Sequence, residues 1–128
     1  MIRGSTMAAL GLAAALLGAG FAQAAPARQC FFAKNITSWA PADSSTVNLR
    51  VNVHDYYQLK LLGECREIDW TGLGIALERR GSEWICEGQD ESVLIVPTPG
   101  IGPRRCPVTS VRKLTDAEVK ALPSKKRP

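Results

Sequence analysis

The sequence has very little of what metal and thiol redox sites are built from. It contains a single histidine, His54, and no two of its four cysteines are spaced as C-x-x-C. Zinc sites in proteins combine cysteine and histidine ligands, and dithiol redox motifs use the C-x-x-C spacing. We therefore expect neither a metal site nor a cofactor.

Long apolar runs are also scarce. The uncharged stretch at residues 7–21 is shorter than the roughly 18 residues that a membrane-spanning helix requires. Arg3 precedes this stretch and an A-x-A cleavage sequence follows it at residues 22–24, a pattern typical of a secretory signal peptide. We predict a signal peptide over residues 1–24, a mature chain that begins at Ala25, and no stable membrane anchor after cleavage.

The first cysteine, Cys30, closely follows the predicted cleavage site and would carry either a lipid or a disulfide. A lipoprotein signal has small residues immediately before the modified cysteine, whereas Arg28 and Gln29 precede Cys30. The disulfide is therefore favoured, and with it a periplasmic or secreted location, because disulfides persist in oxidising compartments and stabilise small domains. We expect two disulfides among Cys30, Cys65, Cys86 and Cys106.

The pairing of these cysteines cannot be obtained from their spacing, which permits three combinations. Closing a barrel brings the first and last strands together, and Cys30 and Cys106 lie at the starts of those predicted strands. This placement favours Cys30–Cys106 together with Cys65–Cys86.

The chain is mildly basic, with a formal net charge of +4 at pH 7. Part of the excess lies in residues 123–128, which lack the apolar side chains of a packed segment, so we expect a disordered basic tail. An exported protein meets little nucleic acid. We therefore expect no nucleic-acid partner, and instead an envelope protein or an acidic surface.

Two neighbouring segments predict a β-hairpin. Apolar and polar residues alternate over residues 46–53 and again over residues 56–62. A register slip of one residue would turn every side chain to the other face, so the apolar faces must match. The match predicts a loop at residues 54–56. It sets Val53 opposite Tyr57, Val51 opposite Leu59 and Leu49 opposite Leu61.

The other face of this hairpin is polar. The same register sets Arg50 opposite Lys60 and Asn52 opposite Gln58, with Asn48 beside them. Like charges directly across a strand pair are destabilising. One interpretation is that both side chains bend into water at little cost. The alternative hypothesis is that this donor-rich patch binds an acidic partner.

Several shorter segments complete a β-rich fold. Thr115 and Glu118 fit a capping box for a short helix that ends before Pro123. The fold class that we expect is all-β, a small disulfide-bridged barrel or sandwich of about six to seven short antiparallel strands, as one domain over residues 25–122. The further strands are expected at residues 30–39, 75–80 and 83–87 (a hairpin about Gly81-Ser82), 92–97 and 106–114.

Candidate catalytic residues are few. His54 and Asp55 are neighbours, but they fall in the predicted hairpin loop, where polar residues are common for structural reasons. The candidate carboxylates are Asp69 and the group Glu87, Asp90 and Glu91. That group does not follow the order of a calcium-binding loop, and no serine lies in a nucleophile-elbow motif. We expect no enzymatic activity and no catalytic residues. The alternative is a small periplasmic hydrolase that uses these carboxylates.

The residues that flank the cysteines carry a resemblance. The motifs are Gly63-x-Cys65, Trp84-Ile85-Cys86 and Arg105-Cys106-Pro107-Val108. Over residues 30–114 the chain resembles an uncharacterised family of small exported proteobacterial proteins, known as a domain of unknown function with a four-cysteine pattern. The resemblance implies a cell-envelope location and a shared cysteine framework, and it implies no activity or ligand. We interpret the chain as an exported envelope protein that is a non-enzymatic binding or structural module.

Overall fold

A computed structural model describes residues 27–66, 68 and 74–128 of the chain. The predicted signal peptide and Asp69 lie outside the described residues. No helix in the described part is long and apolar enough to span a membrane. The elements are β1 (Cys30–Phe32), η1 (Ala33–Asn35), β2 (Ile36–Asp43), β3 (Thr46–Val51), β4 (Asp55–Leu61), β5 (Ala76–Glu78), β6 (Trp84–Cys86), β7 (Gly88–Gln89), β8 (Val93–Val96), β9 (Arg104–Lys113), α1 (Asp116–Ala121) and η2 (Ser124–Lys126).

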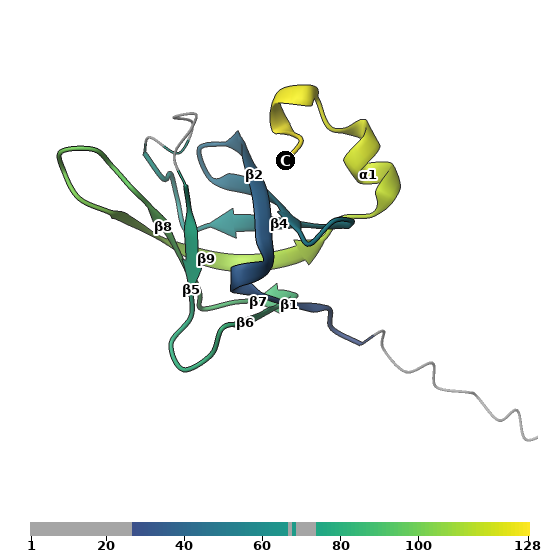
Figure 1. Cartoon of the computed structure of the whole chain (residues 1–128), viewed down its shortest axis with the longest axis horizontal. Helices are drawn as coiled ribbons and strands as arrows, with labels where there is room; N and C mark the ends of the chain where they lie inside the picture. Colours follow the sequence, from purple (N-terminus) through teal and green to yellow (C-terminus); the bar gives the residue numbers. More distant parts are fainter. Residues whose placement is uncertain (1–26, 67, 69–73) are drawn as a thin grey trace, which may run out of the picture.

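Two antiparallel sheets form the described part of the chain, as the all-β prediction indicated. The larger has the strand order β2-β3-β4-β9-β8-β5, with β7 also paired to β9, and the smaller contains β1 and β6. The larger sheet curls into a half-barrel, in which β2 and β5 are the edges (Figure 1). The short helix α1 follows the last strand, and its capping box between Thr115 and Glu118 is confirmed.

The sheet bends where pairing along β9 becomes irregular. Strand β9 pairs with β4 on one edge and with β7 and β8 on the other. On the β4 edge, Thr109 is an extra residue, because Lys60 pairs with Ser110 and Leu61 with Val108. On the opposite edge, three residues between β7 and β8 face this same point. Because bulges bend strands and increase their twist, the half-barrel curls about this segment of β9.

The core fills the concave side of the half-barrel. Alternate residues of the predicted hairpin point into it, as the sequence indicated: Leu49, Val51, Tyr57 and Leu59 are all buried. Phe31 from β1 joins them, with its ring centroid 4.5 Å from that of Tyr57. The smaller sheet thus packs against the larger one and closes the end of the core.

The predicted register of the hairpin is wrong. Leu49 lies opposite Tyr57, and Val51 opposite Asp55, so the loop consists of residues 52–54. The strand stops early because Asn52 adopts a positive φ of 53°, a conformation that asparagine tolerates in tight turns. The pairing differs from the predicted one by an even number of residues, so Leu49, Val51 and Leu59 stay on the buried face. Val53, which was predicted opposite Tyr57, lies in the turn instead and is 57% exposed.

The predicted hairpin about Gly81-Ser82 is also wrong. Strand β5 pairs with β8, and β6 pairs with β1. The two segments therefore belong to different sheets. Strands β5 and β6 are adjacent in the sequence but separate in space, because β5 completes the edge of the half-barrel while β6 crosses its end.

The four cysteines form two disulfides, as predicted, but they pair differently from the prediction. Cys30 is bonded to Cys86, and Cys65 to Cys106. Cys30 and Cys86 are direct partners in the β1–β6 ladder, and their Cα atoms are 4.0 Å apart. The argument from barrel closure failed because the sheet stays open, so the first strand never meets the last.

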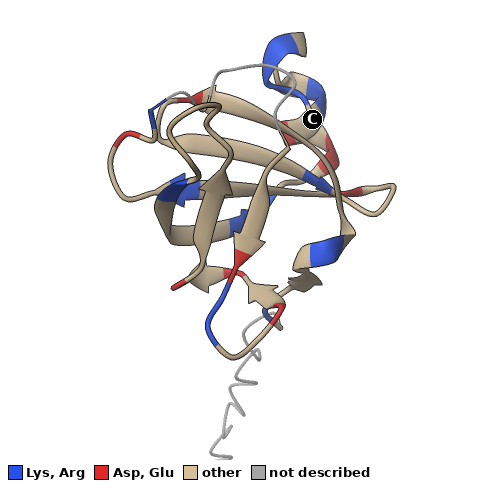
Figure 2. Ribbon diagram, turned by 60° about the vertical axis from the view of Figure 1, so that its left-hand side comes forward, with Lys and Arg blue, Asp and Glu red and all other residues tan. Residues whose placement is uncertain are grey.

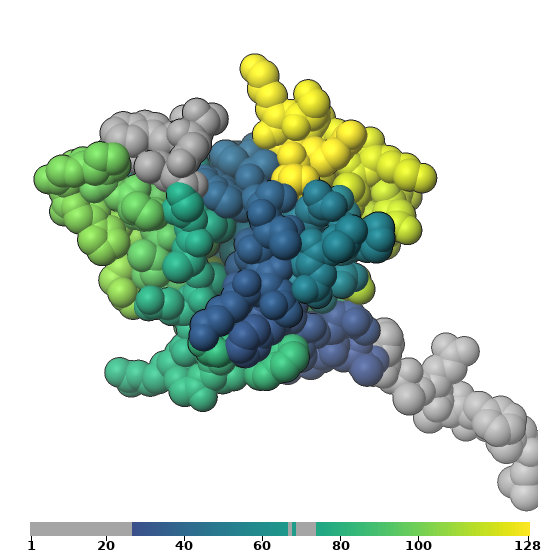
Figure 3. Space-filling view, in the orientation of Figure 1, coloured from purple at the N-terminus to yellow at the C-terminus, as the bar shows by residue number. Residues whose placement is uncertain are grey.

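The C-terminal tail, for which disorder was expected, forms η2 and contacts β2. Figure 3 shows the tail, in yellow, packed beside the blue surface of the N-terminal strands. The guanidinium of Arg127 folds back and donates hydrogen bonds to the carbonyls of Lys120 and Leu122, at 3.1 and 2.8 Å. These bonds satisfy carbonyls that the end of α1 leaves open, which fixes the tail next to the helix.

Candidate functional site

The hairpin patch predicted to bind a partner is covered at its centre. Asn48 is fully buried, and its side-chain amide donates a 2.8 Å hydrogen bond to the carbonyl of Lys126 in the tail. Its carbonyl oxygen accepts a 3.0 Å hydrogen bond from Gln58. Asn48 and Gln58 thus form part of the surface against which the tail packs.

The charged members of that patch lie apart. Lys60 is opposite Thr46 and donates to its hydroxyl at 3.4 Å, whereas Arg50 is opposite Tyr56. No like-charge pair faces across these strands, contrary to the predicted register. Asn52 is exposed in the turn. In the view of Figure 2, lysine and arginine are spread over several elements, with acidic residues between them.

The His54-Asp55 pair is divided between a turn and a strand. His54 is exposed in the loop after β3. Asp55 begins β4 and forms an ion pair with Lys113 of β9, with 3.3 Å between Nζ and the carboxylate. This contact joins neighbouring strands, which is a structural role.

A polar groove opens where β9 bends, and we call it the bulge groove. It has a volume of about 740 Å³. One wall comes from the segment between β7 and β8, and the other from the ends of β4 and β5 and the middle of β9. The residues that matter below are Leu62, Arg79, Gln89, Asp90, Glu91 and Ser92.

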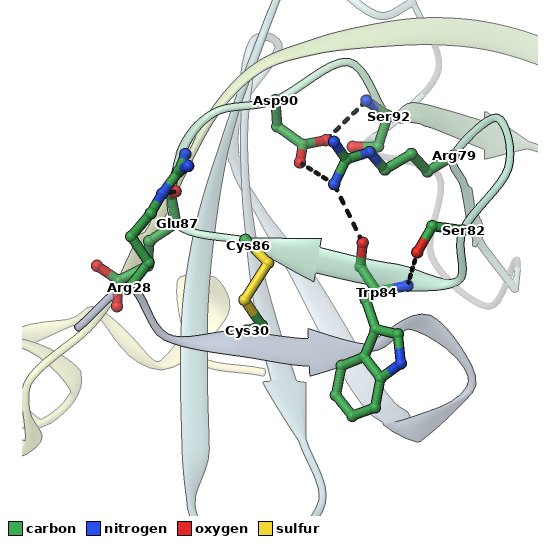
Figure 4. A network of polar contacts seen from close by, with 9 residues as sticks. All are labelled: Arg28, Cys30, Arg79, Ser82, Trp84, Cys86, Glu87, Asp90 and Ser92. Atoms are coloured by element: carbon green, nitrogen blue, oxygen red, sulfur yellow. Dashed lines mark hydrogen bonds and ion pairs between the residues drawn. A yellow bond between two sulfur atoms is a disulfide. The ribbon is translucent and has the colours of Figure 1, made fainter.

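Asp90 holds the shape of this groove. Its side chain is 2% exposed, and one carboxylate oxygen accepts a 2.6 Å hydrogen bond from the backbone N–H of Ser92 (Figure 4). Such an Asx turn stabilises an irregular backbone. The other oxygen lies 4.0 Å from Nη1 of Arg79, and the backbone N–H of Asp90 donates to the carbonyl of Thr109 at 3.3 Å. A buried carboxylate is therefore fixed in orientation.

Arg79 reaches the groove from the residue after β5. Its Nη1 donates to the carbonyl of Trp84 at 3.3 Å and stands beside Asp90. The side chain is 37% exposed, so part of the guanidinium faces solvent. Arginine carries five N–H donors, of which this contact uses one. The groove thus presents a positioned cationic donor beside a buried anionic acceptor.

Ser92 is the unusual member of the site. The residue is 1% exposed, and its hydroxyl has no hydrogen-bond partner in the described part of the chain. Its backbone, in contrast, is fully used, because the N–H donates to Asp90 and the carbonyl accepts from Val108 at 2.9 Å. A buried polar group without a partner costs free energy, and native structures contain few of them.

A clamp between the N-terminal segment and β6 supports the β7 wall of the groove. The Cys30–Cys86 disulfide lies at its centre, and Nε of Arg28 donates to the carbonyl of Glu87 at 2.8 Å (Figure 4). Gly88 has a φ of 102°, and a Cβ atom there would come within 2.7 Å of Nη2 of Arg28. The positive φ therefore favours glycine, and any larger side chain would also have to displace the end of Arg28.

A second groove, of about 560 Å³, separates η1 from the edge strand β5. Its apolar floor includes Ile36 and Ile75, which pack against the core. Its charged side chains Lys34 and Glu83 are exposed and paired with each other at 3.1 Å. This groove lacks a fixed, buried polar group among the described residues, so the bulge groove is the stronger candidate site.

Sequence reasoning found only part of the bulge groove. Asp90 and Glu91 are among the candidate carboxylates of the sequence, but the sequence does not predict a role for Arg79 or Ser92. The D-x-S spacing of Asp90 and Ser92 is a signal for an Asx turn. Nothing local predicts Arg79, because the pairing of β5 with β8 brings it there. The described residues include no group of His, Cys, Asp and Glu able to hold a metal ion.

Fold and site together define a small, disulfide-clamped β protein, a half-barrel with a polar groove at its central bend. The chain belongs to the family of unknown function DUF6491, whose model matches residues 3–128. The predicted resemblance to a family of unknown function is thus confirmed, and the four cysteines of this chain form two disulfides. Comparisons with curated proteins and with solved structures give no match.

Proposed function

We propose that this chain is an exported cell-envelope protein, periplasmic or secreted, that acts as a non-enzymatic binding module with the bulge groove as its binding site. One observation carries the proposal. Among the residues that the structure describes, the hydroxyl of Ser92 has no partner, and it is buried beside Arg79 and Asp90.

The physical reason is the cost of that hydroxyl. Alanine at position 92 would keep the backbone contacts of Ser92 and remove the unsatisfied group, so stability alone does not favour serine. Serine is favoured if its hydroxyl gains a partner when a ligand is present. Unsatisfied and strained groups concentrate at functional sites for this reason.

Export is supported by two independent features of the chain. The A-x-A sequence follows an uncharged segment in the pattern of a secretory signal. The two disulfides, which leave no free cysteine in the described residues, are compatible with an oxidising compartment.

The environment of Asp90 favours binding over hydrolysis. One of its oxygens is committed to the N–H of Ser92, and Arg79 stands next to the other. A general acid or base needs an oxygen that is free to exchange a proton with the substrate, whereas both oxygens of Asp90 already lie against groups of the protein. A buried carboxylate held in one orientation is better suited to holding a ligand than to proton transfer.

Photo-crosslinking in the cells that produce the chain tests this proposal. The photoreactive residue p-benzoylphenylalanine replaces Gln89, which is exposed and lines the groove. The control carries it at Ile101, which is 75% exposed in the loop between β8 and β9. We expect an adduct of defined mass from position 89 alone, on a periplasmic or secreted chain that begins at Ala25.

Two results would contradict the proposal. Equal adducts from both positions would mean that the groove is not special, and no adduct from position 89 would remove it as a binding site. A chain that retains Met1, or that carries a lipid on Cys30, would refute export by the predicted route.

A further inference from the structure

Resting on the proposed function, we infer that the bulge groove binds a residue of an extended peptide, through the N–H and C=O groups which that residue presents on one side. The inference concerns the ligand and goes beyond the existence of a binding site. It follows from the charges, the hydrogen-bonding capacity and the walls of the groove.

The charges favour an uncharged ligand group. A cation that reached the buried carboxylate of Asp90 would lie beside the guanidinium of Arg79, whose Nη1 is only 4.0 Å from that carboxylate. An anion that approached Arg79 would meet Asp90 and, at the exposed rim, Glu91. Repulsion between like charges at such distances is considerable near a protein surface. A neutral group with both a donor and an acceptor is attracted by both partners.

The hydrogen-bonding capacity specifies that group further. The 4.0 Å between Nη1 of Arg79 and Oδ2 of Asp90 exceeds a hydrogen bond, so the two groups stand side by side without bonding directly. Arg79 has further donors, and Oδ2 is an acceptor whose companion oxygen is already used by Ser92. The groove therefore offers a donor and an acceptor on the same side of a ligand.

An extended peptide residue matches this arrangement. In a hydrogen-bonded antiparallel pair, one residue uses its own N–H and its own C=O toward the same neighbour. Here the C=O would accept from Arg79, and the N–H would donate to Asp90. A single trans secondary amide, such as the acetamido group of an amino sugar, points its N–H and C=O in opposite directions. Such a group could satisfy one partner but not both.

The remaining walls of the groove suit a peptide side chain. Leu62 is 68% exposed and, together with Pro107, gives the groove an apolar side. Burying an apolar side chain there would add to the main-chain hydrogen bonds. We therefore expect an apolar residue, such as leucine, at the bound position.

The test is a titration of the exported, disulfide-bonded chain, followed by the NMR signals of the Ser92 amide and the Arg79 Nε–H. The probe is a terminally blocked tripeptide, N-acetyl-Ala-Leu-Ala-N-methylamide, and the comparator is N-acetylglucosamine. We expect saturable shifts of both signals with the peptide. The amino sugar should cause no saturable shift.

A pair of charge-matched variants makes the test specific. In Asp90→Asn, the side-chain oxygen keeps the bond to the Ser92 N–H while an NH₂ donor replaces the acceptor Oδ2, so peptide affinity should fall by about tenfold or more. Glu83→Gln removes the same charge from an exposed side chain outside the bulge groove and should change affinity by less than about twofold. If Asp90→Asn fails to fold, Arg79→Lys keeps the charge, loses the planar fork and should weaken binding in the same direction.

The outcomes separate the inference from the proposed function. Saturation by the amino sugar alone, no saturation by the peptide, or equal affinity of Asp90→Asn and the unmodified chain would overturn the inference. If the in-cell adduct from position 89 nevertheless forms, the groove still binds, and only its ligand was wrongly inferred. If neither the adduct nor the titration shows binding, both the peptide inference and the proposed binding function are wrong.

Discussion

The side-chain amide of Asn48 donates a 2.8 Å hydrogen bond to the main-chain carbonyl of Lys126, 78 residues further along the chain. This bond explains how a polar residue on the outer face of a hairpin comes to be fully buried. It also makes residues after α1 part of the fold, although their composition alone indicates disorder.

Deletion of residues 123–128 should therefore destabilise the protein. Asn48 loses its acceptor, and the carbonyls at the end of α1 lose Arg127, so we expect the free energy of unfolding to fall by about 1–2 kcal/mol. Denaturant unfolding measures this change. The control is Lys126→Ala, which keeps the main-chain carbonyl and should be neutral. A deletion without effect would show that the tail does not hold Asn48.

The clamp at Gly88 gives a second prediction. Gly88→Ala must strain a φ of 102° and also displace Arg28 from the carbonyl of Glu87. Gly81→Ala strains a similar positive φ of 76° but meets nothing within 4 Å. Thermal unfolding should show Gly88→Ala to be the more destabilised by about 1 kcal/mol, the value of one hydrogen bond. Equal losses for the two variants would mean that Arg28 contributes nothing.

The two disulfides should differ in their response to a reductant. Cys30 is exposed, whereas Cys65 and Cys106 are 1% and 6% exposed. Thiol–disulfide exchange requires access to a sulfur atom, so mild reduction of the native protein should open Cys30–Cys86 first. Alkylation followed by peptide mass mapping identifies the opened pair. Simultaneous labelling of all four cysteines would contradict this order.

Tyr57 should make stability sensitive to alkaline pH. Burial, helped by the negative charges of Asp55 and Glu87, raises the pKa of its phenol above the ordinary value of 10.0. The folded state thus prefers the neutral phenol. Its contribution is complete below pH 10 and is lost as the pH rises from 10 through the raised pKa, where the unfolded chain is already ionised.

Denaturant unfolding at a series of alkaline pH values checks this prediction. The midpoint should fall more steeply with pH in the unmodified chain than in Tyr57→Phe, which has no phenol to ionise. Parallel curves for the two chains would mean that Tyr57 does not couple folding to pH.

The sequence predicted what depends on local alternation and failed where distant segments meet. Leu49, Tyr57 and Leu59 were placed correctly on the buried face, because the period of two residues is visible in the chain. The predicted cross-strand partners were wrong, because any even shift keeps the same face of each strand buried. Asn52 also ends the first strand earlier than predicted. Two disulfides followed from the number of cysteines, but their pairing required the β1–β6 ladder.

The bulge groove shows the same division. Asp90 and Ser92 are close in sequence, and their turn is a local feature that the D-x-S spacing can indicate. Arg79 joins them only through the pairing of β5 with β8, which no local pattern predicted. That the Ser92 hydroxyl has no partner among the described residues depends on all the neighbours around it, so this could be recognised only in the folded molecule.

The most direct test of the binding groove combines stability and binding in one variant, Ser92→Ala. Because the hydroxyl is buried without a partner in the described part of the chain, its removal should leave the thermal midpoint unchanged or raised. The yield of the in-cell crosslink from position 89 should nevertheless fall markedly. A midpoint lowered by about 4 °C or more, with an unchanged crosslink yield, would show that the hydroxyl serves the fold and not a ligand.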